Sequence, residues 1–73
     1  MKYYILFESY NWGLSLEAKL KSEKIKYTIS PTPREFSVSC GMSIIYNVED
    51  EDRIKEIVEK HNIRIKGFEK LDK

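Results

Sequence analysis

The 73-residue sequence predicts an α+β fold of the ferredoxin-like type, with the element order βαββαβ. Short apolar stretches alternate with two stretches of helical periodicity, which is the first observation behind this prediction. The second is composition: 41% of the residues are hydrophobic and Pro and Gly are scarce, as in a packed globule. We therefore expect a four-stranded antiparallel sheet with two helices on one face, built as a single domain over residues 1–73.

The first half of the chain predicts a strand, a helix and a second strand. Residues 3–7 are continuously apolar or aromatic, which is typical of a central strand buried on both faces. Ser9 or Asn11 can cap the helix that follows, in which an apolar residue recurs every four positions. These residues are Trp12, Leu16 and Leu20. In residues 25–30, apolar and polar residues alternate, which predicts a half-buried strand with Ile25, Tyr27 and Ile29 on its buried face.

The second half predicts a strand, a helix and a last strand. Residues 42–46 form the third strand, and the acidic run 49–52 favours a helix that begins near Asp50. The apolar stripe of this helix is Ile54, Ile57, Val58 and His61. We assign His61 a structural role at the helix end. Residues 63–66 alternate as a fourth strand, and Gly67 indicates a bulge.

The segment between the second and third strands, residues 31–41, has no strand periodicity and holds Cys40, the only cysteine. Thr32 and Glu35 have capping-box spacing around Pro33, which predicts a single helical turn. Since a crossover helix makes strands one and two parallel, the end of strand one and this loop share one rim of the sheet. We therefore expect Cys40 to lie near Ser9, Tyr10 and the start of the first helix.

Cys40 is the candidate reactive group, because a cation or a helix N-terminus lowers a thiol pKa and favours the thiolate. Arg34 is the only cation in the loop, and Ser37, Ser39 and Gly41 can offer hydroxyl or backbone donors to an anion. We predict that Cys40 is exposed and activated. The alternative is a buried cysteine that acts as a small hydrophobe.

Several classes of function lack support. The net charge of +1 and the missing signature on strand three argue against nucleic-acid binding. The longest apolar run is too short to cross a membrane. His61 and Cys40 show no metal-ligand spacing, so we predict no metal and no cofactor. A single cysteine and no apolar signal segment predict a cytoplasmic protein.

The residues Pro31-Thr32-Pro33-Arg34, Ser37 and Ser39-Cys40-Gly41 resemble the loop of a bacterial family described as selenium or sulfur carrier-like proteins. The resemblance extends over nearly the whole chain. It implies a protein that holds a sulfur or selenium atom on Cys40, as a persulfide or selenopersulfide, and exchanges it with donor and acceptor proteins. It also implies that Arg34, Ser37, Ser39 and Gly41 orient or stabilise that group. Nothing in the sequence selects between the two elements.

A carrier of this kind is not an enzyme, and no residue is placed by the sequence as a base for Cys40. The alternative function is a small dimeric interaction or regulatory module in which Cys40 is incidental or redox-sensing. The sheet face without helices could expose an apolar patch for such a homodimer. Its residues are Tyr4, Leu6 and Ile45.

Overall fold

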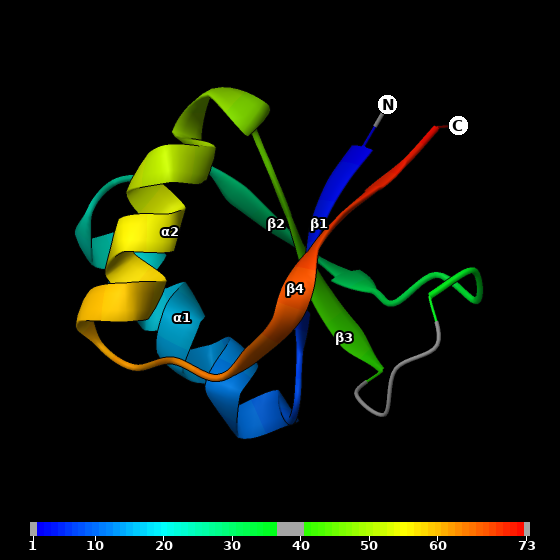
Figure 1. Ribbon diagram of the computed structural model, residues 1–73, viewed down its shortest axis with the longest axis horizontal. Helices are drawn as coiled ribbons and strands as arrows, with labels where there is room; N and C mark the ends of the chain where they lie inside the picture. The colour runs from blue at the N-terminus through cyan, green and yellow to red at the C-terminus, as the bar shows by residue number, and fades with distance from the viewer. Residues whose placement is uncertain (1, 37–40, 73) are drawn as a thin grey trace.

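The structure is a computed structural model that describes residues 2–36 and 41–72 (Figure 1). Its elements are β1 (Lys2–Phe7), α1 (Tyr10–Ser22), β2 (Tyr27–Pro31), β3 (Met42–Tyr46), the 3₁₀ turn η1 (Val48–Asp50), α2 (Glu51–Lys60) and β4 (Ile65–Leu71). The strand order is β2-β3-β1-β4, and each neighbouring pair is antiparallel. The predicted α+β, ferredoxin-like arrangement is confirmed.

Both helices lie on one face of the sheet, and residues 32–36, which follow β2, extend on the other side (Figure 1). The core forms between the helices and the two central strands, and its fully buried large side chains are Ile5, Phe7, Leu16, Leu20, Ile44 and Ile54. The alternation along β1 sends Ile5 and Phe7 toward the helices and Tyr4 and Leu6 toward the opposite face. All four are buried, so the prediction of a central strand apolar on both faces is confirmed.

The two helices end in the same way, with a residue in the left-handed conformation followed by a buried isoleucine. Lys24 has φ 58° after α1, and Asn62 has φ 53° after α2. The Ile25 N–H then donates to the Leu20 carbonyl at 3.0 Å, as in a Schellman cap, and Ile63 makes the equivalent bond after α2. Strands two and four therefore begin at residues 27 and 65, two residues later than predicted, because these isoleucines close the helices.

Replacing Lys24 by glycine is expected to raise the free energy of unfolding by roughly 0.5 to 1 kcal/mol. In the left-handed region, a residue with a β-carbon costs about 1 to 2 kcal/mol of stability relative to glycine. The additional backbone entropy that glycine loses on folding offsets part of the gain. Asn62→Gly should stabilise less, since asparagine tolerates this conformation. Urea denaturation measures both values. Ser15→Gly, in the interior of α1, is the control and should destabilise; a similar loss in Lys24→Gly would contradict the prediction.

The sheet face opposite the helices is not an open apolar patch. Tyr4 and Leu6 are each only 5% exposed, and Ile45 is half-buried. The Phe36 ring, from the loop after β2, packs edge-on against Tyr4 with ring centroids 5.5 Å apart. The expected exposure of Tyr4 and Leu6 is therefore wrong. The apolar patch that was the reason to expect a homodimer through this face is therefore absent from the described residues.

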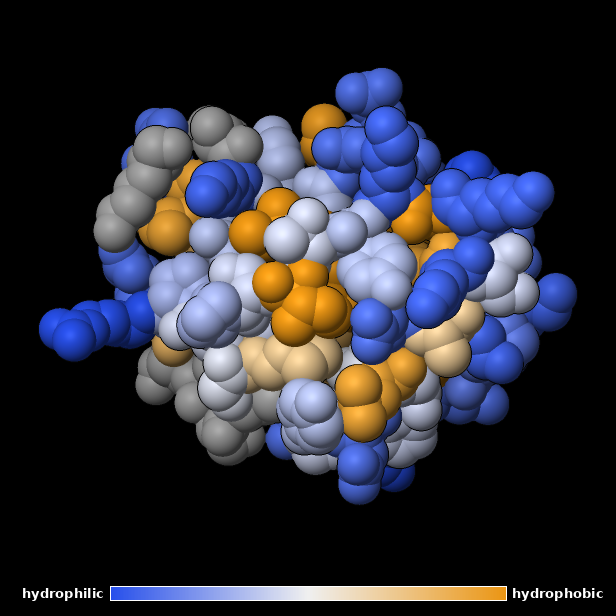
Figure 2. Space-filling model, turned by 180° about the vertical axis from the view of Figure 1, so that it is seen from behind, coloured by the Kyte–Doolittle hydropathy of each residue, from blue (hydrophilic) through white to orange (hydrophobic). Residues whose placement is uncertain are grey.

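The edge strand β2 is less covered than its alternating pattern predicted. Tyr27 is half-buried, and Ile29 is 42% exposed although it lies on the apolar face of the strand. Figure 2 views the molecule from behind Figure 1 and shows apolar side chains in the middle of that side, surrounded by hydrophilic ones. The helix layer therefore does not extend fully over the outer strand.

The remaining predictions for the second half are mostly confirmed. Ile54 is buried, Ile57 and Val58 are half-buried, and α2 begins at Glu51. His61 is exposed rather than part of the packed stripe, and it stands at the C-cap, where its N–H donates to the Ile57 carbonyl. The register between β1 and β4 shifts next to Gly67, which has φ 156°, so the bulge is confirmed.

Candidate functional site

The loop between β2 and β3 is closed at its base by hydrogen bonds that continue the β2–β3 pairing. The Thr32 N–H donates to the Gly41 carbonyl at 3.0 Å, one step beyond the last pair of the ladder. Below it, the hydroxyl of the fully buried Ser43 donates to the Ser30 carbonyl at 3.2 Å. The residue that follows Cys40 in sequence is thus fixed to the end of the sheet.

The first arm of the loop is a single hydrogen-bonded turn. The Phe36 N–H donates to the Pro33 carbonyl at 3.0 Å, a span of three residues. The predicted helical turn is therefore a turn at the same residues, without a helix. Arg34 is exposed at this turn, while Phe36 is half-buried against Tyr4. The aromatic contact holds the turn on the sheet and leaves the guanidinium at the surface.

The second arm, at Gly41, lies at the rim where β1 ends. Leu6 pairs with Ser43 in the antiparallel ladder, so the end of β1 and the start of β3, which Gly41 precedes, lie at the same rim of the sheet. A β-carbon on Gly41 would meet no atom of the described residues within 4 Å. Packing in the described part of the chain therefore does not require glycine here.

Only part of the predicted site can be compared with the structure. Arg34 and Gly41 lie on the two arms of the loop, whereas Ser37, Ser39 and Cys40 lie outside the described residues. Arg34 forms no ion pair with any residue in 2–36 or 41–72. The exposure of Cys40, its ionisation and its proximity to Ser9 and Tyr10 stay predictions.

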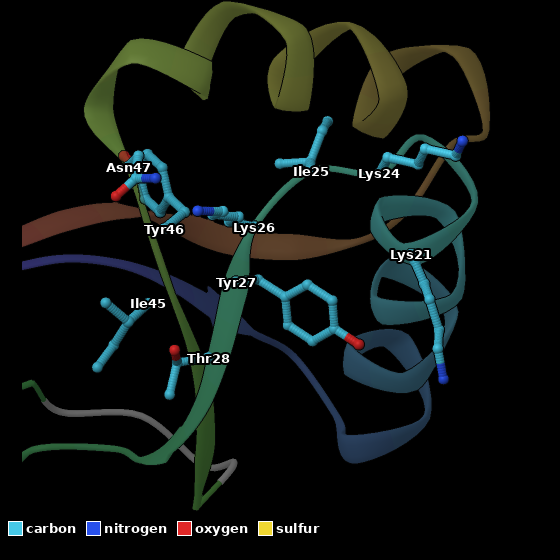
Figure 3. Close-up of a pocket in the computed structure, with 9 residues that line it drawn as sticks. All are labelled: Lys21, Lys24, Ile25, Lys26, Tyr27, Thr28, Ile45, Tyr46 and Asn47. Carbon is cyan, nitrogen blue, oxygen red and sulfur yellow. The ribbon is translucent and has the colours of Figure 1, made fainter.

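Sequence reasoning missed an open groove of about 700 Å³ at the opposite end of β2 (Figure 3). Its lining residues are Lys21, Lys24, Ile25, Lys26, Tyr27, Thr28, Ile45, Tyr46 and Asn47. Lys21 projects from the last turn of α1 and Lys24 from the turn after it, and both point away from Lys26, which extends toward Tyr46 and Asn47. The net charge of the whole chain is near zero and gave no indication of these lysines. Their close spacing between residues 21 and 26 could have indicated them.

Carboxylates that flank this groove already have partners. Glu17 accepts a hydrogen bond of 2.9 Å from the Tyr27 hydroxyl, and that bond raises the pKa of Tyr27. Glu23 pairs with Arg53 at 3.8 Å. Within the described parts of the chain, the three lysines themselves form no ion pair. The groove is therefore lined by three lysines without an ion-pair partner in the described residues, while the Glu17 carboxylate beside it keeps its charge in its hydrogen bond with Tyr27.

The described residues contain no group of three or more His, Cys, Asp or Glu side chains that could hold a metal ion. None of the helices in residues 2–36 and 41–72 has the length and apolar character needed to cross a membrane.

A comparison with known proteins identified the family of this chain. A family model described as "Putative Se/S carrier protein-like" matches residues 2–70, nearly the whole chain. The chain belongs to this family. The match confirms the resemblance inferred from the sequence, and the family description supports a carrier that interacts with other proteins. A search of curated proteins and a search of solved structures each found no match.

Proposed function

We propose that this protein carries a sulfur or selenium atom on Cys40, as a persulfide or selenopersulfide, between donor and acceptor proteins. The family match over residues 2–70, in a chain with one cysteine, is the observation that carries the proposal. The geometry around the loop supports it. Gly41 is fixed to the sheet by Thr32, and Arg34 stands exposed on the other arm.

Loading requires one thiolate and no net oxidation. The Cys40 thiolate attacks the outer sulfur of a donor persulfide, R–S–SH, and forms a new S–S bond. The S–S bond of the donor breaks, R–S⁻ leaves, and Cys40 becomes Cys–S–SH. A donor R–S–SeH reacts in the same way at selenium, and attack by an acceptor thiolate reverses the transfer. A nearby permanent cation would stabilise the anions on this path, and this is the role proposed for Arg34. Ser37, Ser39 and Gly41 would add hydrogen-bond donors.

Intact-mass spectrometry after incubation with glutathione persulfide tests this function. The wild-type chain is expected to gain one sulfur atom and to lose it to an added acceptor thiol, and Cys40→Ser should gain none. If the loop favours the Cys40 thiolate, loading near neutral pH should be roughly threefold faster than in a peptide of residues 37–43, because the larger thiolate fraction outweighs the lower nucleophilicity of a more acidic thiol.

Three outcomes would contradict the proposal. A loading rate equal to that of the free peptide would show that the loop does not activate Cys40. Gain of a whole glutathione in place of one atom would indicate redox sensing instead. A wild-type chain that gains no atom while the peptide does would show that Cys40 is inaccessible. Arg34→Gln should load more slowly than Arg53→Gln, which removes a charge on α2.

A further inference from the structure

The outer edge of β2 offers free backbone groups. Among the strands of residues 2–36 and 41–72, β2 lies at the edge of the sheet, with β3 as its one neighbour. Because Thr32 bonds to Gly41, the antiparallel alternation directs the backbone groups of Ser30 and Thr28 toward β3. Those of Tyr27 and Ile29 then point outward. Two residues of β2 thus present both an N–H and a carbonyl to an incoming strand.

The ends of β2 limit where such a strand can bind. Pro31 has no N–H, and its carbonyl accepts a hydrogen bond from the Ser30 hydroxyl at 3.2 Å. Proline at the end of an edge strand restricts pairing. Pairing is therefore directed to Tyr27 and Ile29. The exposed Ile29 side chain adds an apolar contact beside the free backbone.

The charge of the groove beside β2 determines which kind of segment can bind at this edge. The start of β2 borders the groove that holds Lys21, Lys24 and Lys26, and none of the three has an ion-pair partner in the described part of the chain (Figure 3). A second copy paired antiparallel through Ile29 would bring this lysine end toward the Arg34 end of the other copy. Like charges would then oppose each other. A strand with carboxylates near its end meets the lysines favourably.

We propose that β2 is a docking strand for an extended, acidic segment of the donor or acceptor protein. The segment adds to the sheet by hydrogen bonds to Tyr27 and Ile29 and places its carboxylates at the groove lined by Lys21, Lys24 and Lys26. β2 connects the lysine groove at its start to the loop that contains Cys40 at its end. The identity of the partner rests on the proposed carrier function; the docking edge rests on the sheet register and the lysine groove.

The first test uses a capped peptide of alternating Glu and Val, six residues long, titrated into ¹⁵N-labelled protein. We expect NMR shift changes centred on residues 24–30. A matched peptide of alternating Lys and Val should bind at least about tenfold more weakly, a difference of roughly 1.4 kcal/mol. The acidic peptide N-methylated at alternate amides should also bind weakly, because it cannot donate to the β2 carbonyls.

The second test changes the protein. Lys21→Glu with Lys26→Glu should weaken binding at least about tenfold at low salt, whereas the matched pair Lys60→Glu with Lys66→Glu, away from the groove, should weaken it much less. Ile29→Pro removes one outward N–H and keeps the bonds to β3, so it should also weaken binding. If Ile29→Pro does not fold, the N-methylated peptide tests the same bonds.

Shift changes centred elsewhere, equal weakening by both charge-reversed pairs, or full binding of the N-methylated peptide would overturn the docking strand. Shifts at β2 that depend on protein concentration without peptide would indicate a second copy and would also overturn it. The carrier function is tested separately. Cys40→Ser should keep peptide binding, and the β2 variants should still gain one sulfur atom from glutathione persulfide.

Discussion

Replacing Tyr4 by alanine is expected to lower the free energy of unfolding by about 3 kcal/mol, a large share of the stability of a domain this small. Tyr4 is 5% exposed on the sheet face opposite the helices, where the Phe36 ring covers it. Its removal leaves a cavity under the turn of residues 33–36. We therefore also expect faster tryptic cleavage after Arg34, because the turn loses the ring that holds it on the sheet.

The matched control is Phe36→Ala, which removes the same ring contact through a half-buried side chain. It should lose less stability, about 1 to 2 kcal/mol, and increase cleavage after Arg34 to a similar extent. A double-mutant cycle between Tyr4 and Phe36 should give a coupling of about 0.5 to 1.5 kcal/mol, typical of an aromatic pair. Zero coupling, or an unchanged cleavage rate in both variants, would show that this contact does not hold the loop.

Replacing Tyr46 by phenylalanine is expected to lower the free energy of unfolding by about 1 to 2 kcal/mol near neutral pH. The Tyr46 side chain is 4% exposed at the end of β3, and its hydroxyl donates to Glu51, the first residue of α2, at 2.5 Å. Glu51 also pairs with Lys55 at 3.1 Å. The hydrogen bond joins the start of α2 to the sheet. Urea denaturation measures the loss.

The effect of Tyr46→Phe should depend on pH. The hydrogen bond from Tyr46, helped by Lys55, lowers the pKa of Glu51 below its usual 4.5. Stability from this carboxylate is therefore present above pH 4.5 and is lost as the pH falls through the folded-state pKa. The difference between wild type and variant should shrink in acid. Burial and the bond to Glu51 raise the pKa of Tyr46, so wild-type stability should also fall as the pH rises above 10.

Tyr27→Phe is the control for this experiment. The Tyr27 hydroxyl donates to Glu17 at 2.9 Å, in a half-buried position on the edge strand. Its loss should have a smaller effect, because water can replace a bond at an exposed site more readily. Equal losses in the two variants, or a Tyr46→Phe effect that stays constant from neutral pH into acid, would contradict the proposed role of the Tyr46–Glu51 pair.

Sequence patterns predicted the elements that depend on local periodicity. β3 spans residues 42–46, as its apolar run indicated, and Leu16 and Leu20 are buried as the four-residue spacing of α1 required. The patterns were less accurate where helices end. Ile25 and Ile63 fit a strand alternation but serve in the helix caps, because Lys24 and Asn62 adopt the left-handed conformation without glycine to indicate it.

The sequence by itself determined the fold class, the single thiol at Cys40 and the cation at Arg34, because residue identity and local periodicity carry that information. Only the tertiary structure decided that Phe36 covers Tyr4, that Ile29 stays exposed on an edge strand, and that three lysines border one groove. These features join residues far apart in the chain. Their contacts depend on strand order, register and how far the helices extend over the sheet, which no local pattern specifies.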